Sequence, residues 1–111
     1  MTVSTHVLDA GAGTPAAGVS VTLSRLADGW LDVESGVTSA DGRYRFTAET
    51  PSGTYRLVFA TGAYFAARAA ATFYPEVTVA FTIPDPAAEA PGHFHVPLLL
   101  SPFAYSTYRG S

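Results

Sequence analysis

The amino-acid sequence predicts an all-β protein, a two-sheet β-sandwich of about eight strands with one short helix. Short segments alternate strictly between apolar and polar residues, which is the pattern of half-buried strands. Ten glycines and eight prolines are spread along the 111 residues, and 48% of the residues are hydrophobic. Many short strands separated by frequent turn residues are typical of a sandwich. We expect one domain covering residues 1–111, with antiparallel strands and Greek-key-like connections.

The first half of the chain contains the first four predicted strands. In residues 3–8 the odd-numbered side chains are expected to face inward and the even-numbered ones outward. Residues 19–23 repeat the alternation, and a third strand is expected within residues 30–37. A turn at residues 40–42 then leads into a fourth segment, residues 43–46. In this segment the rings of Tyr44 and Phe46 are expected to point inward and the two arginines outward.

The second half contains four more strands, one helix and one long loop. Tyr55, Leu57 and Phe59 form one inward set, and residues 77–83 give the cleanest alternation in the chain. Two late strands are expected in residues 93–100 and 103–108. Helix and loop have different signals. The alanine-rich segment from Gly62 to Ala71 lacks a two-residue period and reads as a short helix, and the proline-rich run from Pro84 to Gly92 reads as a surface loop.

Composition excludes several classes of function. The chain has no cysteine, so disulfides, thiolate metal sites and cysteine nucleophiles are excluded, and a cytoplasmic location is expected. Neither a signal peptide nor an apolar run of about 18 residues is found, so we expect a soluble protein with no membrane partner. A net charge of −3 with only six basic residues, all arginine, argues against binding to nucleic acid.

Side chains that could take part in catalysis or binding fall on the outward faces of the predicted strands. His6 lies opposite Val7, Arg43 lies opposite Tyr44, and Tyr108 lies on the outward face of the last segment. In the strand before it, the outward side chains are those of His93, His95, Pro97 and Leu99. A face that mixes histidine, arginine and leucine suggests a surface covered by another subunit, with a wet cleft left in it.

These residues also have simpler interpretations. A lone outward histidine is usually solvated and idle, and Asp41-Gly42-Arg43 is first of all a good hairpin turn. The spacing of His93 and His95 would, together with His6, also allow a zinc site with three imidazole ligands. A serine-histidine-aspartate triad has less support, because the sequence contains no Gly-x-Ser-x-Gly segment.

Five segments in order along the chain carry a resemblance to a known family. They are STHVLD at residues 4–9, TGAYF at 61–65, FYPE at 73–76, HFHVPLLLSP at 93–102 and YSTYRGS at 105–111. On these segments the chain resembles the 5-hydroxyisourate hydrolases of the transthyretin-like family. The terminal Tyr-Arg-Gly-Ser is the part most specific to these enzymes, since transthyretin, the hormone carrier of the same fold, lacks it.

Small departures from the family pattern are also visible. Phe94 stands where a tyrosine is common, Phe103-Ala104 replaces a frequent Tyr-Gly, and the loop from Pro84 to Gly92 is rich in proline. These changes affect packing and a loop, and they leave the chemical groups in place.

The resemblance implies a transthyretin-like (prealbumin-like) sandwich and a metal-independent hydrolase without a cofactor. The implied reaction is hydrolysis of 5-hydroxyisourate to 2-oxo-4-hydroxy-4-carboxy-5-ureidoimidazoline in urate degradation. Its implied catalytic residues are His6, Arg43 and His95, and its implied substrate-binding residues are His6, Arg43, Tyr108, Arg109, Gly110 and Ser111. The resemblance also implies a homotetramer with active sites in channels where two dimers meet.

The chemistry of these side chains fits that reaction. His6 and His95 are expected to share water activation and proton return, and the fork of Arg43 donors to meet a carbonyl or a developing negative charge. Tyr108 offers an aromatic wall, Ser111 a hydroxyl and a carboxylate, and His93 is expected at the rim. Two other functions stay open at this point: a small-molecule carrier of the same fold without catalysis, and a zinc-dependent hydrolase using the histidines. A purely structural sandwich would leave the polar outer face unexplained.

Overall fold

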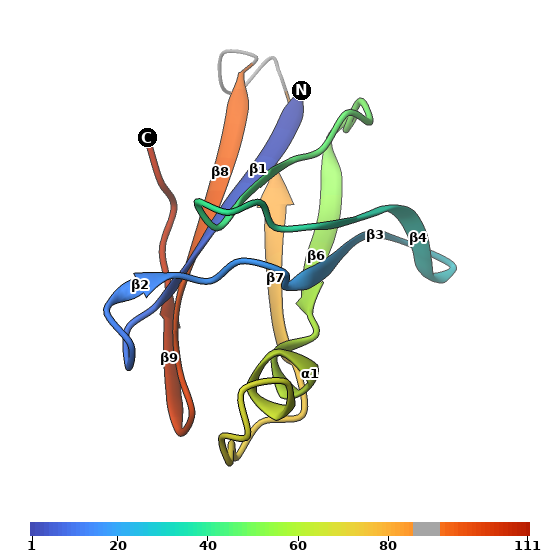
Figure 1. Cartoon of the computed structure of the whole chain (residues 1–111). Coiled ribbons are helices and arrows are strands. Elements are labelled where there is room, and N and C mark those ends of the chain that lie inside the picture. The colour runs from blue at the N-terminus through green and yellow to red at the C-terminus, as the bar shows by residue number, and fades with distance from the viewer. Residues whose placement is uncertain (86–91) are drawn as a thin grey trace.

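The computed structural model describes residues 1–85 and 92–111, which form two β-sheets packed face to face and one short helix (Figure 1). The loop expected from Pro84 to Gly92 lies mostly outside the described residues. In chain order the elements are β1 (Thr2–Asp9), β2 (Thr14–Pro15), β3 (Ser20–Ala27), β4 (Gly29–Val37), β5 (Arg43–Arg45), β6 (Gly53–Phe59), α1 (Thr61–Ala66), β7 (Val77–Ile83), β8 (His93–Ser101) and β9 (Ala104–Thr107).

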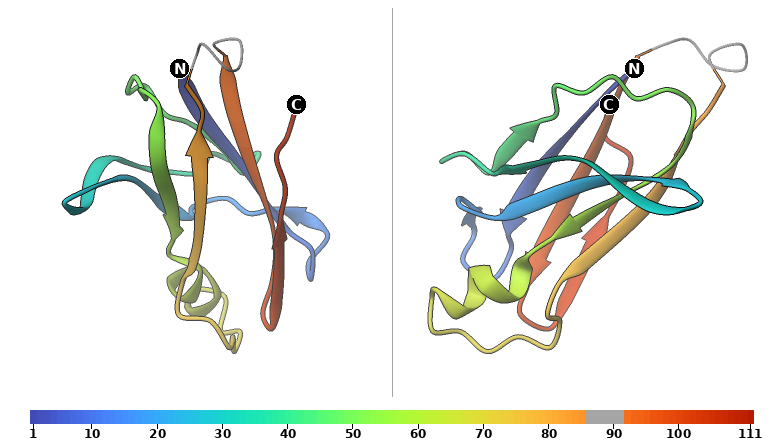
Figure 2. Two further views of the ribbon diagram at one scale, coloured as in Figure 1. Left: turned by 180° about the vertical axis from the view of Figure 1, so that it is seen from behind. Right: turned by 90° about the vertical axis from the view of Figure 1, so that its right-hand side faces the viewer.

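The first sheet is built around β1 and β8. On one side β1 pairs with β8, on the other it pairs with both β2 and β5, and β9 extends the sheet beyond β8. In the second sheet the order is β4-β3-β6-β7. Both views of Figure 2 show β1 and β8 side by side and α1 at the end of the sandwich opposite the N-terminus. The predicted all-β, two-sheet fold with one short helix is therefore confirmed.

Alternation sorts the core from the surface as the sequence predicts. In β1 every odd-numbered residue from Val3 to Asp9 is buried and every even-numbered residue from Thr2 to Leu8 is half-buried. Tyr55, Leu57 and Phe59 of β6 are at most 1% exposed. Burial of such side chains contributes about 1.5–3 kcal/mol each to the free energy of folding. The core therefore occupies the inner faces, and the outer face of the first sheet carries little of it.

The structure differs from the sequence prediction in its strand directions. β1 and β8 run parallel, although we expected every pair to be antiparallel. A tight hairpin forces antiparallel pairing, whereas strands joined through the rest of the chain are free to run in the same direction. The described residues contain nine strands, one more than the sequence predicts. The additional strand is the two-residue β2, which is too short to produce an alternation signal.

The helix is shorter than predicted. It covers Thr61–Ala66, whereas the sequence suggested Gly62 to Ala71. Ala69 adopts a left-handed conformation with φ of 54°, the N–H of Ala70 donates to the carbonyl of Phe65, and the N–H of Ala69 donates to the carbonyl of Ala66. This pair of bonds is a Schellman motif, which ends a helix and is more usually built on glycine.

Pro97 sits at a position in β8 where the pairing with the tail of the chain is interrupted. The ladder between β8 and β9 covers Leu98 to Ser101 of β8 and therefore stops one residue short of Pro97. The Pro97 carbonyl accepts a hydrogen bond from Oγ1 of Thr107 at 2.7 Å, so the backbone polar groups of this proline point toward the tail of the chain. Pairing with the tail resumes at the bridge between His95 and Gly110, so Pro97 lies at an interruption of the ladder, where the missing N–H is tolerated.

Strand β5 is only three residues long and is held in place by a carboxylate on β4. Glu34 accepts hydrogen bonds from the hydroxyl of Tyr44 at 2.7 Å and from the backbone N–H groups of Thr47 and Ala48. Burial alone would raise the pKa of Glu34, but these hydrogen bonds together hold it below its ordinary value. The ring of Tyr44 lies directly over Gly36, where a Cβ atom would come within 2.1 Å of it. Glu34 and Gly36 thus fix where β5 lies.

No helix in the described residues is long and apolar enough to span a membrane.

We predict that Gly36→Ala lowers the free energy of unfolding by about 1–3 kcal/mol, the usual cost of forcing a methyl group into a filled site. The added Cβ must displace the Tyr44 ring and with it β5. Urea denaturation followed by circular dichroism measures the change. Ser35→Ala, which alters the neighbouring surface hydroxyl, is the matched control and should cost under about 0.5 kcal/mol. Equal stability of the two variants would contradict the packing role of Gly36.

Candidate functional site

The outer face of the first sheet brings together three side chains that the sequence singled out. In the parallel ladder Ser4 lies opposite His95 and His6 lies opposite Pro97, while on the other edge of β1 His6 lies opposite Arg43. Because side chains at paired positions point to the same face, His6, Arg43 and His95 share one surface. Three strands from distant parts of the chain therefore supply one cluster.

His6 is held by the turn that precedes β5. Its Nε2 lies 2.9 Å from the backbone carbonyl oxygen of Asp41. A carbonyl oxygen only accepts hydrogen bonds, so Nε2 of His6 carries the proton and donates it. In the neutral ring the other nitrogen, Nδ1, is then the acceptor and can take a proton from a bound molecule.

Arg43 is fixed by the same turn. Its Nε lies 3.3 Å from a carboxylate oxygen of Asp41, and both side chains are more than half exposed. A hydrogen bond from the Ser39 hydroxyl, followed by the charge of Arg43, lowers the pKa of Asp41. An exposed pair of this kind contributes little to stability, so its main effect is to orient the guanidinium.

His95 is connected to two other side chains through the hydroxyl of Ser4. The Ser4 oxygen lies 2.7 Å from Nδ1 of His95 and 2.5 Å from Nε2 of His93, and Oγ1 of Thr2 lies 2.7 Å from Nδ1 of His93. Burial lowers the pKa of His95, and the nearby charges of His93, Arg43 and His6 lower it further. Burial, and then the charge of Arg45, also lower the pKa of His93. Both rings are therefore predominantly neutral at neutral pH.

A pocket of about 170 Å³ opens on this face. Its lining residues are Ser4, Thr5, Arg43, Tyr44, Arg45 and His95. Two guanidinium groups and a neutral imidazole around one small pocket favour a planar or anionic guest that is rich in oxygen.

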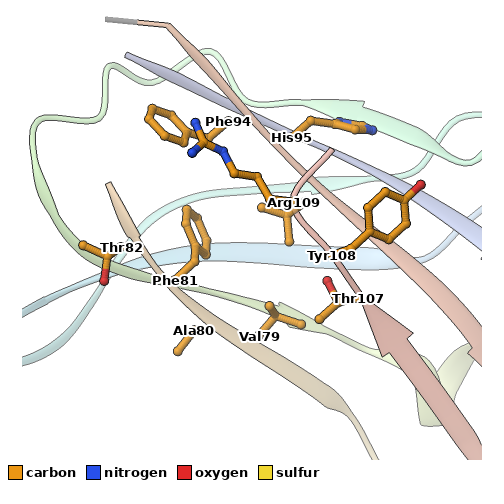
Figure 3. A pocket seen from close by; sticks show the side chains of 10 residues that line it. Val79, Ala80, Phe81, Thr82, Phe94, His95, Thr107, Tyr108 and Arg109 are labelled. Atoms are coloured by element: carbon orange, nitrogen blue, oxygen red, sulfur yellow. The ribbon is translucent and has the colours of Figure 1, made fainter. Parts of the chain in front are cut away.

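The tail of the chain passes beside His95. The N–H of Gly110 donates to the carbonyl of His95 at 2.8 Å, and a Cβ atom on Gly110 would lie 2.5 Å from Cδ2 of the His95 ring. Residue 110 must therefore be small for the tail to approach this closely. Tyr108 is 59% exposed, and in Figure 3 its ring extends to the same side as His95.

Arg109 points away from this cluster. Its guanidinium lies 4.8 Å from the centre of the Phe94 ring, and Phe94 belongs to the inner face of β8. Figure 3 shows both side chains in a second pocket, of about 250 Å³, which lies between β7 and the tail. The lining of this pocket is mostly apolar, and of the catalytic residues expected from the sequence it contains only His95. The smaller pocket on the outer face therefore fits hydrolytic chemistry better.

The structure thus places the expected residues in two groups. His6, Arg43 and His95 meet on the outer face, with Gly110 packed against His95. Arg109 lies on the other side of the sheet, and Ser111 is exposed beyond Gly110.

Ser4 and Arg45 belong to the cluster but were not singled out from the sequence. Both were assigned to outward faces, so the parity signal for them was present. What could not be read was the register of β1 against β8, which places the Ser4 hydroxyl between two imidazoles. Serine and arginine on a strand surface are ordinarily solvated, so their type alone gave no reason to select them.

The zinc alternative finds no geometric basis in residues 1–85 and 92–111. Within these ranges no group of three or more histidine, aspartate, glutamate or cysteine side chains is arranged to hold a metal ion. His93 and His95 instead share the Ser4 hydroxyl between them.

Comparison with protein families and known proteins gives a consistent result. The model of the HIUase/Transthyretin family matches residues 3–110. The chain is 45% identical to the 5-hydroxyisourate hydrolase of Salmonella typhimurium, over 98% of this chain and 80% of the relative. It is also 45% identical to the 5-hydroxyisourate hydrolase of Mus musculus, over 98% of this chain and 94% of the relative.

Solved structures of the same fold include both an enzyme and transthyretin. The 5-hydroxyisourate hydrolase of Klebsiella pneumoniae superposes with a TM-score of 0.87 at 41% identity, covering all of both chains. Transthyretin from Sparus aurata superposes with a TM-score of 0.87 at 36% identity, covering 97% of this chain and 95% of that one. Overall shape therefore does not separate the two, and the side chains of the site must do so.

We predict that Arg43→Gln raises the pKa of His95. Loss of a nearby positive charge makes the protonated ring less unfavourable, while its burial is unchanged. Titration of the histidine ring protons by NMR measures this directly, with Arg25→Gln on β3 as a control that removes a distant arginine. An unchanged or lowered pKa of His95 in Arg43→Gln would contradict the electrostatic coupling.

Proposed function

The chain belongs to the HIUase/transthyretin family, and we propose that it is an enzyme that hydrolyses 5-hydroxyisourate, as the names of its relatives state. The observation that carries this proposal is the meeting of His6, Arg43 and His95 on one outer face beside the tail. A carrier has no need of two histidines placed to accept protons beside an oriented arginine. We propose the outer-face pocket as the place where the substrate binds.

Hydrolysis needs water to be activated, negative charge to be stabilised and a leaving nitrogen to be protonated. Water loses a proton to a neutral imidazole as its oxygen bonds to the ring carbonyl carbon of the substrate. Cleavage of the adjacent C–N bond then leaves a nitrogen that takes a proton back. In the neutral His6 ring the proton is on Nε2, which faces the Asp41 carbonyl, so Nδ1 can accept a proton. The lowered pKa of His95 keeps that ring neutral. We assign the two proton transfers to these two rings jointly.

Arg43 supplies positive charge where the carbonyl oxygen becomes negative. Its attachment to Asp41 through Nε orients the guanidinium before substrate arrives. A group that is already in place gives up little conformational freedom in the transition state. Lysine could not present the same planar fork of donors.

The tail completes the site in this proposal. Gly110 brings the chain against the His95 ring, and Tyr108 offers an aromatic wall on the same side. Ser111 follows immediately and is proposed to contact substrate through its hydroxyl. Arg109, which lies over Phe94, is proposed to act by holding the tail in position. The proposal requires no metal and no cofactor, and a cytoplasmic location stays a prediction.

The function itself is tested by generating 5-hydroxyisourate from urate with urate oxidase and following its ultraviolet absorbance. We expect the protein to accelerate the decay, and His6→Ala and His95→Ala each to lower the catalysed rate by about 10²–10⁴-fold. Both side chains lie off the core face, so the variants should keep their melting temperatures within a few degrees of the parent. A decay rate unchanged by the parent protein would refute the proposed function.

The tail gives a second prediction. Removing residues 108–111 deletes a mostly exposed segment that supplies no buried core side chain, so the truncated protein should still melt cooperatively. Lost positioning should lower the rate on 5-hydroxyisourate at least ~100-fold. The milder Gly110→Ala, which forces a Cβ against the His95 ring, should lower it in the same direction. Full activity after truncation would remove the tail from the site.

We also propose a homotetramer with active sites where two dimers meet. The outer face carries half-buried Leu8 and Leu99 beside the charged cluster, which is poorly suited to free water. Light scattering at micromolar concentration should give the mass of four chains of 11.6 kDa each. The mass of a single chain at that concentration would contradict this assembly.

A further inference from the structure

Four side chains on the outer face form a continuous line of hydrogen bonds that ends at His95. It runs from Oγ1 of Thr2 to Nδ1 of His93, from Nε2 of His93 to the Ser4 hydroxyl, and from that hydroxyl to Nδ1 of His95. Every link is 2.5–2.7 Å long. The parallel register produces the line, because it places Thr2 opposite His93 and Ser4 opposite His95.

Donors and acceptors in such a line are coupled. A hydroxyl has one proton to donate, and a neutral imidazole has one donor and one acceptor nitrogen. If Ser4 donates to His95, then His93 must donate to Ser4 through Nε2, and Nε2 of His95 carries a proton. If Ser4 donates to His93, then His95 must donate to Ser4 through Nδ1, and its Nε2 is a free acceptor. The direction of one hydroxyl therefore decides whether His95 offers substrate an acid or a base.

We propose that Ser4 and His93 are positioning residues that set, and during the reaction switch, the tautomer of His95. This inference rests on the proposed function. A proton from the attacking water bonds to Nε2 of His95, and the proton on its Nδ1 moves to the Ser4 oxygen. The original hydroxyl proton of Ser4 moves to Nε2 of His93, which becomes an imidazolium. His95 stays neutral and now carries the proton on the nitrogen that faces the leaving group.

The surroundings of the two rings fit this assignment. His93 is only partly covered and is the more exposed of the two rings, whereas His95 is half-buried, so a positive charge is better hydrated on His93. Arg43 and His6 face His95, and Arg45 faces His93. These charges oppose protonation of both rings, so the resting line contains two neutral imidazoles. Two neutral rings are what the line needs in order to switch between its two hydrogen-bond directions.

The first test uses the full chain with ¹⁵N-labelled histidine rings and no substrate. Only three histidines are present, so each ring is assigned by its own single variant. At about pH 8.5, some two units above the ordinary histidine pKa, long-range ¹H–¹⁵N spectra report which nitrogen of each neutral ring carries the proton. Ser4→Ala should change the tautomer ratio of both His93 and His95, and His93→Gln should change that of His95.

Two variants serve as controls for this test. Ser4→Thr keeps the hydroxyl and should restore the parent ratios, and Ser35→Ala removes a surface hydroxyl from the other sheet and should change nothing. In every variant the His6 ring should keep its proton on Nε2, since that nitrogen is held by a carbonyl. A His95 tautomer ratio that is the same in Ser4→Ala, His93→Gln and the parent would overturn the coupling.

The second test asks whether the coupling serves the reaction. Ser4→Ala and His93→Gln should lower kcat on 5-hydroxyisourate by about 10-fold to 100-fold with KM within about 2-fold, and Ser4→Thr should recover most of the loss. Altered tautomers with an unchanged kcat would overturn the catalytic role of the line. A parent protein that is inactive on 5-hydroxyisourate would instead refute the proposed function. In that case the NMR spectra would still show whether the tautomers of His93 and His95 are coupled through Ser4.

Discussion

The parallel ladder between β1 and β8 is the constraint on which the rest of the site depends. It joins the beginning and the end of the chain over eight residue pairs from Thr2 and His93 to Asp9 and Leu100. Side chains alternate between faces along each strand, so a slip of one residue would pair His6 with a core position or expose Val7. The buried valines and leucines of the inner face therefore fix the register, and the register fixes which outer side chains meet. Core packing thereby determines the geometry of a cluster that takes almost no part in it.

Because the inner faces form the core and the outer face forms the site, one small domain can hold reactive side chains without losing stability. Inner faces hold the apolar side chains, with residues such as Val3, Leu57 and Leu98 fully buried. On the outer face the polar groups satisfy one another: His6 with a carbonyl, Arg43 with Asp41, and both other histidines with Ser4. Charged groups clustered on one side would repel each other if all were ionised. Lowered pKa values at His93 and His95 relieve that repulsion and leave the rings able to accept protons.

Strand β5 shows how a distant anchor supports the site. Three residues of strand are too few to stay in place by backbone pairing alone, and the strand depends on Tyr44 reaching the Glu34 carboxylate across to β4. Arg43 and the turn that holds His6 are attached to this strand. The carboxylate of Glu34 thus takes no part in the proposed chemistry but determines where the arginine stands. Residues of this kind support a site through position and do not touch the reacting atoms.

The sequence by itself determined the fold class and the inward and outward faces of most of the longer strands, because alternation is a local property that each segment displays alone. Alternation placed His6, Arg43 and His95 on outward faces, and the family resemblance is what proposed them as site residues. The sequence also indicated the small tail beside His95 through the resemblance of its last residues to a family of enzymes. Only the tertiary structure decided that β1 and β8 run parallel, that the Ser4 hydroxyl stands between two imidazoles, and that Arg109 turns inward over Phe94. The first two of these features depend on the register between segments far apart in the chain, as in the Ser4 and His95 pair, which are 91 residues apart. Such pairings are determined by the packing of the whole core, and that packing cannot be deduced from any single segment of the sequence.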